Sequence, residues 1–183
     1  MELSLRDRQR ELLELLDKSA ATLYALFTRL TLREDVAEEL MQELFIKLSD
    51  PRGLDKVNNW DAYACRAAIN LAFDWRRRQK RHAVRLDDIG EPVSSDNSPL
   101  DKIIHTEELQ QTLDTIAQLK GATREALVMR YIQQQSYDQI AQQLGKTAHH
   151  VRALCSKGMN RLRDILGHDQ LRPSRKEVHD VES

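Results

Sequence analysis

Apolar residues recur at helical spacing along most of the chain. Between residues 36 and 48 every fourth position is apolar (Val36, Leu40, Leu44 and Leu48), which places these side chains on one face of a helix. Comparable stripes precede and follow this segment, and no stretch shows the sustained alternation of apolar and polar residues that indicates a strand. The pattern therefore predicts an all-α fold.

The stripes fall into two blocks, and we expect two small helical domains. The first spans about residues 1–82 and the second about residues 106–167. The segment from Ala83 to Asp101 is rich in Ser, Pro, Asn and Asp, and Arg85 is its only cation among several acidic residues. Residues 83–105 are therefore expected to be a flexible acidic linker. The apolar pattern is lost after Gly167, which predicts a disordered tail over residues 168–183.

The second block begins with a helix that is expected to carry Leu109, Leu113, Ile116 and Ala117. Gly121 is expected to close this helix, because glycine is a frequent helix terminator. Thr123 is expected to cap the next helix, which carries Ala126, Leu127 and Tyr131.

Residues 136–163 have the pattern of a helix-turn-helix that ends in a basic helix. Ser136 and Gln139 fit a capping box, and Gly145 fits the left-handed turn that ends the first helix. Thr147 fits the cap of the second helix, whose outward positions carry donors suited to a DNA major groove. The candidate DNA contacts are His149, His150, Arg152, Ser156, Lys157 and Arg161. The alternative is an ordinary helical hairpin with a solvated basic face, and the agreement of turn, caps and charge favours DNA.

A second basic cluster closes the first block, from Trp75 to His82. Cations attract a phosphate backbone, aromatic rings offer stacking surfaces and asparagine can read a base edge, a mixture that favours single-stranded or melted DNA. The candidate residues are Asn58, Asn59, Trp60, Asn70, Asp74, Trp75, Arg76, Arg77 and Lys80. Cations at a helix C-terminus also interact favourably with the helix dipole, so a basic helix end alone is weak evidence for DNA binding. The presence of a second basic site on the other block makes the evidence stronger.

The composition limits the remaining classes of function. The net charge is −1, so nucleic-acid binding must come from segregated patches rather than from a general excess of cations. No apolar run is long enough to span a bilayer and no signal peptide opens the chain, so we expect a cytoplasmic protein without membrane insertion. No nucleophile and base accompany the carboxylates of residues 38–43, so we expect no catalytic residue and no enzyme activity.

The cysteines and histidines do not form a metal-binding pattern. A zinc site needs four converging ligands, and His149, His150 and Cys155 on one continuous helix do not supply them. Cys65 and Cys155 are instead expected to be reduced, buried thiols. No metal and no other cofactor is therefore expected.

Taken together, these segments resemble a bacterial sigma factor of the extracytoplasmic-function (ECF) group over nearly the whole chain. Residues 34–48 (EDVAEELMQELFIKL) resemble the helix with which this family binds core RNA polymerase. The family's promoter-melting segment has the pattern R-x-A-x-N-x-A-x-D-x-x-R-R, and the matching residues are Arg66, Ala68, Asn70, Ala72, Asp74, Arg77 and Arg78. Residues 123–163 resemble the domain that reads the upstream promoter element.

The resemblance implies a role for each candidate set. Glu39, Gln42, Glu43 and Phe45 would bind the clamp of the largest polymerase subunit. The candidates between Asn58 and Lys80 would capture a flipped base of the −10 element, and those on the last helix would enter the −35 major groove. The implied partners are core RNA polymerase (clamp and flap), promoter DNA and an anti-sigma factor. The acidic linker would thread toward the polymerase active-site channel.

The chain departs from the family pattern in the last helix. His149 and His150 stand where the family usually has Gly-Thr, and Lys157-Gly158-Met159 stands where Arg-Ala-Arg is frequent. A glycine inside a helix, as at Gly158, costs about 1 kcal/mol relative to alanine. Two other functions stay open from the sequence: a stand-alone helix-turn-helix regulator, and a sigma-like adaptor that binds an anti-sigma protein without touching DNA.

Overall fold

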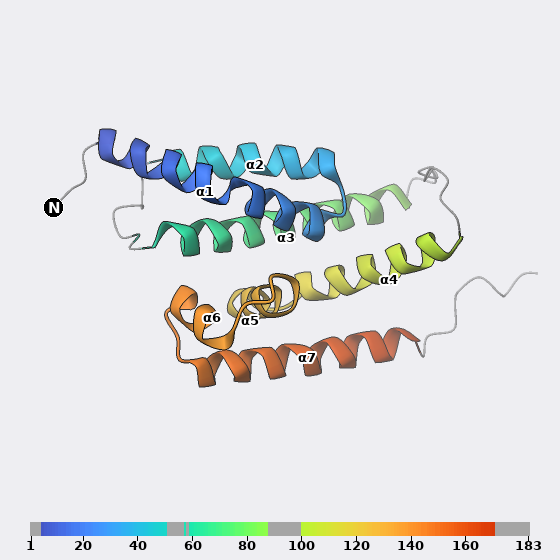
Figure 1. The fold of residues 1–183 in the computed structure, drawn as a ribbon. Coiled ribbons are helices and arrows are strands. Elements are labelled where there is room, and N and C mark those ends of the chain that lie inside the picture. Colours follow the sequence, from blue (N-terminus) through green and yellow to red (C-terminus); the bar gives the residue numbers. More distant parts are fainter. Residues whose placement is uncertain (1–4, 51–56, 58, 88–99, 171–183) are drawn as a thin grey trace, which may run out of the picture.

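The computed structural model describes residues 5–50, 57, 59–87 and 100–170, and these residues form helices without any strand. The predicted all-α fold is therefore confirmed. Figure 1 shows the helices in two layers, with the first three in one layer and the others in the second. Their bounds are α1 (Leu5–Thr31), α2 (Glu34–Ser49), α3 (Trp60–Asp87), α4 (Leu100–Ala117), α5 (Gly121–Leu127), η1 (Val128–Ile132), α6 (Tyr137–Leu144) and α7 (Ala148–Gln170).

The first domain is a three-helix unit held by the predicted apolar stripes. Leu40 and Leu44 of α2 are buried, as are Phe27 and Leu30 of α1. The α3 helix contributes small residues that let it approach closely, and Phe73, which is fully buried. The apolar stripe at every fourth residue of α2 is confirmed, since all four of its members are buried.

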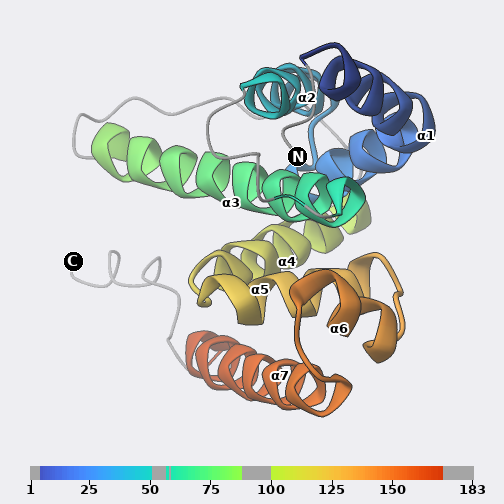
Figure 2. The same ribbon diagram turned by 90° about the vertical axis from the view of Figure 1, so that its left-hand side faces the viewer.

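The second domain packs α4, α5 and α6 against α7, and Figure 2 shows α4 and α5 lying between α3 and α7. Its core contains Leu113, Leu127, Met129, Ile140 and Val151. Buried apolar side chains of the two domains form one continuous cluster, so the domains are in direct contact. The α7 helix consequently lies at the edge of the molecule remote from the first domain.

Several local expectations in the second domain were wrong. Gly121 does not close α4 but begins α5, with Lys120 at the N-cap, because its backbone is compatible with a first helical turn. Thr123 consequently does not cap a helix and is buried inside α5. Leu109 and Tyr131 lie on helices, as expected, but both side chains are exposed. Tyr131 lies in η1, a π-helical turn whose wider spacing changes the face on which each residue falls.

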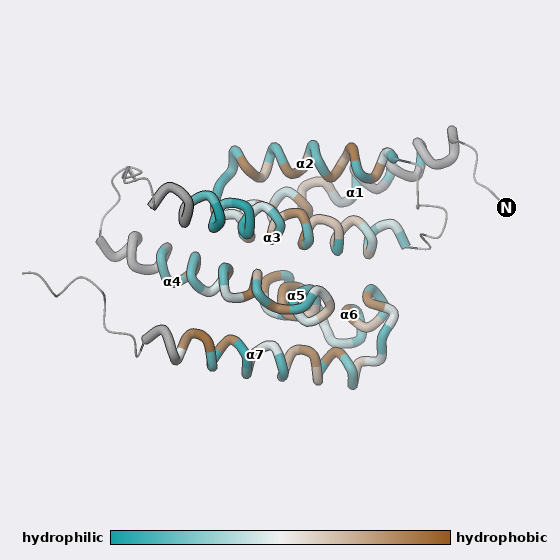
Figure 3. The backbone as a smooth tube through the Cα atoms, turned by 180° about the vertical axis from the view of Figure 1, so that it is seen from behind, coloured by the Kyte–Doolittle hydropathy of each residue, from teal (hydrophilic) through white to brown (hydrophobic). Residues whose placement is uncertain are grey.

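Helices extend into both ends of the segment expected to be a linker. The α3 helix continues to Asp87 and α4 starts at Leu100, because Ala83, Val84 and Leu86 are compatible with a helix and the Ser, Pro and Gly residues stand further along. The acidic stretch over residues 88–99 and the tail beyond Gln170 lie outside the described residues. Figure 3 shows that the hydrophilic end of α3 lies over α4.

The α5 and α7 helices cross at Gly158 with no room for a side chain. A Cβ atom built on Gly158 would lie 2.5 Å from Leu127 Cδ1 and 2.9 Å from Thr123 Cγ2. Both neighbours are themselves buried. The glycine that departs from the family pattern is therefore the residue that permits the close crossing of the two helices.

Candidate nucleic-acid interface

The helix-turn-helix has the caps that the sequence predicts. Ser136 Oγ accepts from the amide of Gln139 (3.2 Å), and Gln139 Oε1 accepts from the amide of Ser136 (2.8 Å), which completes the capping box. Gly145 adopts φ 60°, and Thr147 Oγ1 accepts from the amide of His150 (3.2 Å). These local bonds fix the angle at which α7 follows α6.

The six candidate donors of α7 all project from its exposed side. We define the upstream set as His149, His150, Arg152, Ser156, Lys157 and Arg161, all of which are exposed. The opposite face of α7 is buried through Val151, Cys155 and Leu162. Ser156, Lys157 and Arg161 also border a groove of about 730 Å³ between α7 and the connection from α4 to α5. This arrangement leaves one face of the helix free to enter a DNA groove.

The upstream set includes an arginine held by contacts that sequence reasoning missed. The guanidinium carbon of Arg152 lies 5.1 Å from the ring centroid of Tyr137, and that of Arg130 lies 4.6 Å from the same centroid. Arg130 is fixed in turn by a hydrogen bond from Nη1 to the carbonyl of Gln135 (2.8 Å). Cation–π contacts of this kind restrict a guanidinium at a surface. The ring of Tyr137 therefore positions the Arg152 guanidinium. In the sequence, the only sign of this contact was the position of Tyr137 at the start of α6.

The second candidate group lies on α3 and directly before it. We define the downstream set as Asn59, Trp60, Asn70, Asp74, Trp75, Arg76, Arg77 and Lys80. Asn58, the remaining candidate, lies outside the described residues. Asn59 Oδ1 accepts from the amide of Ala62 (2.9 Å) and so caps α3. Trp60 is half-buried with its ring edge-on to Tyr63, at a centroid distance of 6.4 Å. The beginning of α3 is thus ordered by its own residues.

The middle of α3 is covered by the second domain at Asn70. Its Nδ2 donates to Glu125 Oε1 (3.0 Å), and its Oδ1 accepts from Arg124 Nη2 (2.7 Å). Glu125 also pairs with Arg66 (3.2 Å) and is only 5% exposed. The guanidinium of Arg124 lies over the Phe73 ring at 5.4 Å, and burial lowers the pKa of Arg124. Both ends of the Asn70 amide are therefore occupied.

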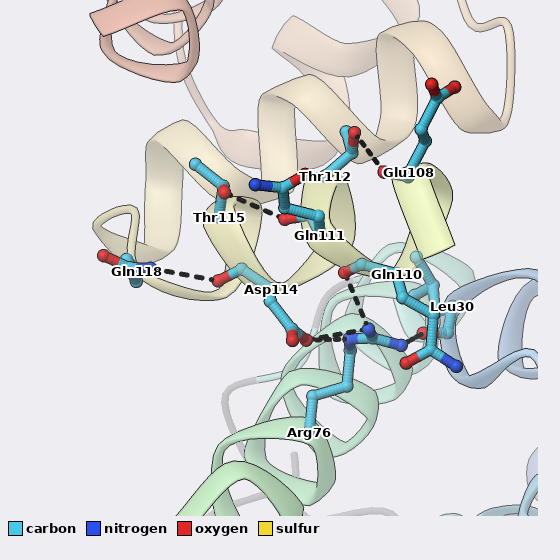
Figure 4. A network of polar contacts seen from close by, with 9 residues as sticks. All are labelled: Leu30, Arg76, Glu108, Gln110, Gln111, Thr112, Asp114, Thr115 and Gln118. Atoms are coloured by element: carbon cyan, nitrogen blue, oxygen red, sulfur yellow. Dashed lines mark hydrogen bonds and ion pairs between the residues drawn. The ribbon is translucent and has the colours of Figure 1, made fainter. Parts of the chain in front are cut away.

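Arg76 is the most extensively bonded member of the downstream set (Figure 4). Its Nε and Nη2 donate to Asp114 Oδ1 at 3.0 and 2.7 Å, and Nη2 also donates to the carbonyl of Gln110 at 3.0 Å. Its Nη1 donates to the carbonyl of Leu30 at 3.1 Å, which ties α3 to the end of α1. With only 4% of its surface exposed, Arg76 cannot reach DNA in this arrangement.

The remaining downstream residues are divided between bonded and open positions. Arg77 donates to the carbonyl of Ala117 (3.2 Å) and forms an ion pair with Asp74. Trp75 and Lys80 border a cavity of about 330 Å³ between α3 and α4, and Lys80 is exposed. The structure therefore brings the downstream set together along α3 but leaves only part of it accessible.

Cys65 also takes part in the contact between the domains. Its Sγ donates to Gln133 Oε1 of the second domain (3.3 Å), and burial raises its pKa to about 11. Burial also raises the pKa of Cys155, inside the second domain. Both cysteines are free and buried, as expected from the sequence.

We expect alkylation of Cys65 to be slow at pH 8, about 100-fold slower than that of a cysteine peptide, because only the thiolate reacts. Since the pKa is raised in the folded chain, the neutral thiol is favoured there. This preference stabilises the folded chain fully below the ordinary cysteine pKa of 9.0. The stabilisation is lost as the pH rises toward about 11. Mass spectrometry of the alkylated peptide across pH 7–11 measures this, and a rate that levels off near pH 9 would contradict it.

The outer face of α2 forms a separate candidate surface. Glu39, Gln42 and Glu43 are exposed, and Phe45 is 44% exposed. Ile46, which sequence reasoning missed, is 69% exposed, although it is apolar and lies outside the buried stripe. Two adjacent apolar residues off the stripe are the signal that would have identified it. Exposed apolar residues among acidic ones are typical of a protein-binding surface.

Two classes of feature are absent from the part of the chain that the structure describes. No group of three His, Cys, Asp or Glu side chains is placed to hold a metal ion. His149 and His150 are exposed while Cys155 is buried, so these three side chains do not converge. Among the described helices, none is sufficiently long and apolar to cross a membrane.

Two family models match the chain, and each match lies within one of its two domains. The model for sigma-70 region 2 matches residues 15–82, and the model for sigma-70 region 4 matches residues 115–164. The ECF RNA polymerase sigma factor SigE of Mycolicibacterium smegmatis is 29% identical over 160 residues, which are 84% of this chain and 60% of that protein. The chain thus spans less than two thirds of the length of that relative.

A solved structure is also similar. It is the sigma factor RpoE in complex with the anti-sigma factor NepR from Bartonella quintana, with 23% sequence identity and a TM-score of 0.45. The match covers 90% of this chain and 99% of that chain.

Proposed function

Because the chain belongs to the sigma-70 family, as an RNA polymerase sigma factor of the ECF group, we propose that it binds core RNA polymerase and directs promoter-specific initiation of transcription. The observation that carries this proposal is the exposed basic face of α7, held at a fixed angle by the capped turn before it. The two sigma-70 domains in order favour this function over a stand-alone regulator, since the region 2 domain would then be unexplained.

The proposed division of labour assigns one promoter element to each domain. The upstream set on α7 reads the −35 element as duplex, because an exposed helix with basic and hydroxyl donors fits a major groove. The downstream set with Asn58 captures an unstacked base of the −10 element, for which amide, aromatic and cationic side chains are suited. The acidic linker, residues 83–105, acts in initiation rather than in DNA recognition.

The proposed partners follow from the same function. Core RNA polymerase is bound through the clamp of its largest subunit and through its flap, and promoter DNA is bound by both domains. An anti-sigma protein is proposed as a further partner, and the cytoplasm as the place of action. The sigma-70 family is not a family of enzymes, and we propose that this chain has no catalytic residue and no cofactor.

The test of the proposal is co-purification with core RNA polymerase followed by transcription from a promoter library. A specific set of transcribed promoters with a shared upstream element is expected. If the chain bound DNA but not core polymerase, a stand-alone regulator would be the better assignment. If it bound neither polymerase nor DNA, the sigma-like adaptor would remain.

Replacing Gln42 and Glu43 together with alanine is expected to weaken core-polymerase binding by about tenfold or more, as for central residues of an interface. Both side chains are exposed and outside the buried stripe of α2, so the fold should persist. Competition for core polymerase against the unmodified chain measures the effect, and circular dichroism checks the fold. Glu107→Ala with Gln142→Ala removes the same two residue types from exposed positions of the second domain and serves as the control.

A further inference from the structure

Two members of the upstream set belong to the residue type that changes charge near neutral pH. His149 and His150 are both exposed, and no hydrogen bond or ion pair engages either imidazole within the described residues. Histidine ordinarily gains its positive charge between about pH 8 and pH 5, whereas arginine and lysine stay charged over this whole range. The upstream set therefore contains two side chains whose contribution to DNA binding can depend on pH.

Helical spacing places each histidine at the head of a row of donors on α7. His149 lies on the same face as Arg152 and Ser156, which follow it by about one and two turns. His150 lies on the same face as Lys157, which follows it by about two turns. Both imidazoles are thus placed to meet the DNA that the two rows are proposed to contact.

No carboxylate among the described residues pairs with either histidine. Lys146 immediately precedes α7 and is exposed. The described charged residues of the helices packed against α7 are Glu107, Glu108 and Asp114 of α4, Arg124 and Glu125 of α5, and Asp138 of α6. Asp114 and Glu125 are bonded to arginines of α3, and Asp138 lies at the end of α6 remote from the turn into α7. Figure 1 shows α4 over the later part of α7, away from its start.

A DNA phosphate would supply the anion that the start of α7 lacks. The N-terminal residues of a recognition helix enter the major groove, and the free backbone amides there attract phosphate oxygens. The bond from the amide of His150 to Thr147 Oγ1 (3.2 Å) fixes the backbone of this first turn. Since a nearby phosphate favours the charged form of an imidazole, binding of DNA at this turn is expected to take up protons.

We propose that His149 and His150 are proton-dependent DNA contacts, which make recognition of the upstream element stronger as the pH falls from about 8 to about 6. The inference rests on the proposed role of the upstream set and concerns its regulation. The sign follows from linkage, because the complex with DNA holds more protons than its separated components and is favoured by them. Each histidine that is protonated on binding changes the affinity by up to about tenfold per pH unit, and we expect a change of about tenfold or more for the pair.

Binding of the full chain to an upstream duplex at two pH values tests the proposal. The probe is a fluorescent duplex with the upstream element shared by the transcribed promoters, and its anisotropy gives the affinity at about pH 6 and pH 8. The slope of log affinity against log salt should be steeper by about 1–2 at the lower pH, because each charged imidazole releases about one more counterion. The cysteines do not interfere, since burial raises the pKa of Cys65 to about 11 and also raises the pKa of Cys155.

Three variants assign the effect to the histidines. His149→Gln with His150→Gln is neutral throughout, so its affinity should be independent of pH and close to that of the unmodified chain at the higher pH. His149→Arg with His150→Arg is charged throughout, so its affinity should be independent of pH and at least that of the unmodified chain at the lower pH. Both positions are exposed, and glutamine and arginine have a higher helix propensity than histidine, so the fold should persist. His82→Gln removes an exposed histidine of α3 and should keep the full pH dependence.

Two results would overturn the inference. One is equal affinity of the unmodified chain at the two pH values, and the other is a pH dependence that survives in His149→Gln with His150→Gln. Both leave the proposed function intact as long as Arg152→Ala still weakens binding to the upstream duplex. Failure of the proposed −35 role is recognised separately, because Arg152→Ala would then leave binding unchanged at either pH.

Discussion

Replacing Gly158 with alanine is expected to lower the stability of the second domain by up to about 2 kcal/mol. Alanine gains about 1 kcal/mol over glycine in helix propensity, but inserting a methyl group into a packed core costs about 1–3 kcal/mol. The added Cβ would lie 2.5 Å from Leu127 Cδ1 and 3.0 Å from Leu127 Cγ. Since Thr123 Cγ2 also lies only 2.9 Å from the added Cβ, two buried side chains would have to shift, and the packing cost is expected to exceed the gain.

Gly167 provides the matched control on the same helix. A Cβ there would meet nothing within 4 Å, so Gly167→Ala is expected to raise stability by about 0.5–1 kcal/mol through reduced backbone entropy of the unfolded chain. Urea unfolding followed by circular dichroism measures both variants, and Gly158→Val should be less stable than Gly158→Ala. A stabilising effect of Gly158→Ala would show that α5 and α7 do not cross as closely as described.

The contrast between these glycines shows what the sequence could and could not predict. Helix propensity describes Gly158 as a local cost, because nothing in the neighbouring sequence indicates that α5 lies against it. The close crossing depends on Thr123 and Leu127, some 30 residues earlier in the chain. Local signals such as the Ser136–Gln139 capping box and the left-handed Gly145 were predicted correctly, since their partners are only a few residues apart.

The same distinction applies to the candidate interface. Periodicity identified the exposed face of α7 and the buried stripe of α2, because amphipathic helices turn their apolar faces inward irrespective of partner. Periodicity could not predict that Arg76 would be buried by Asp114, since both are ordinary surface residue types and their pairing spans 38 positions. Likewise, Tyr131 lies in η1, a π-helical turn that has no simple sequence signal.

Arg152→Ala and Asn70→Ala are expected to affect different steps of initiation. If Arg152 makes a base contact, its removal should weaken binding to the upstream duplex by about 1–3 kcal/mol and relax specificity at one position. Tyr137→Leu, which removes the ring beneath Arg152, should have a smaller effect in the same direction, because the guanidinium is retained but less restricted. Binding to a systematically varied −35 duplex measures both variants.

The effect of Asn70→Ala depends on the state of the chain in which it is measured. In the free chain, the substitution removes the bridge between Arg124 and Glu125 and therefore loosens the interdomain contact. On polymerase, the substitution removes the proposed interaction with the unstacked base. Promoter opening should then be impaired with upstream duplex binding unchanged, as permanganate footprinting of promoter thymines would report.

A pre-melted template separates the two roles further. It supplies the opened strands, so it should partly rescue Asn70→Ala but should not restore the binding of Arg152→Ala to the upstream element. The reason is that the first variant fails to stabilise unpaired bases, whereas the second fails to hold duplex DNA before melting begins. If both variants gave the same profile on duplex and pre-melted templates, one shared DNA surface would have to replace the two that the domains are proposed to carry.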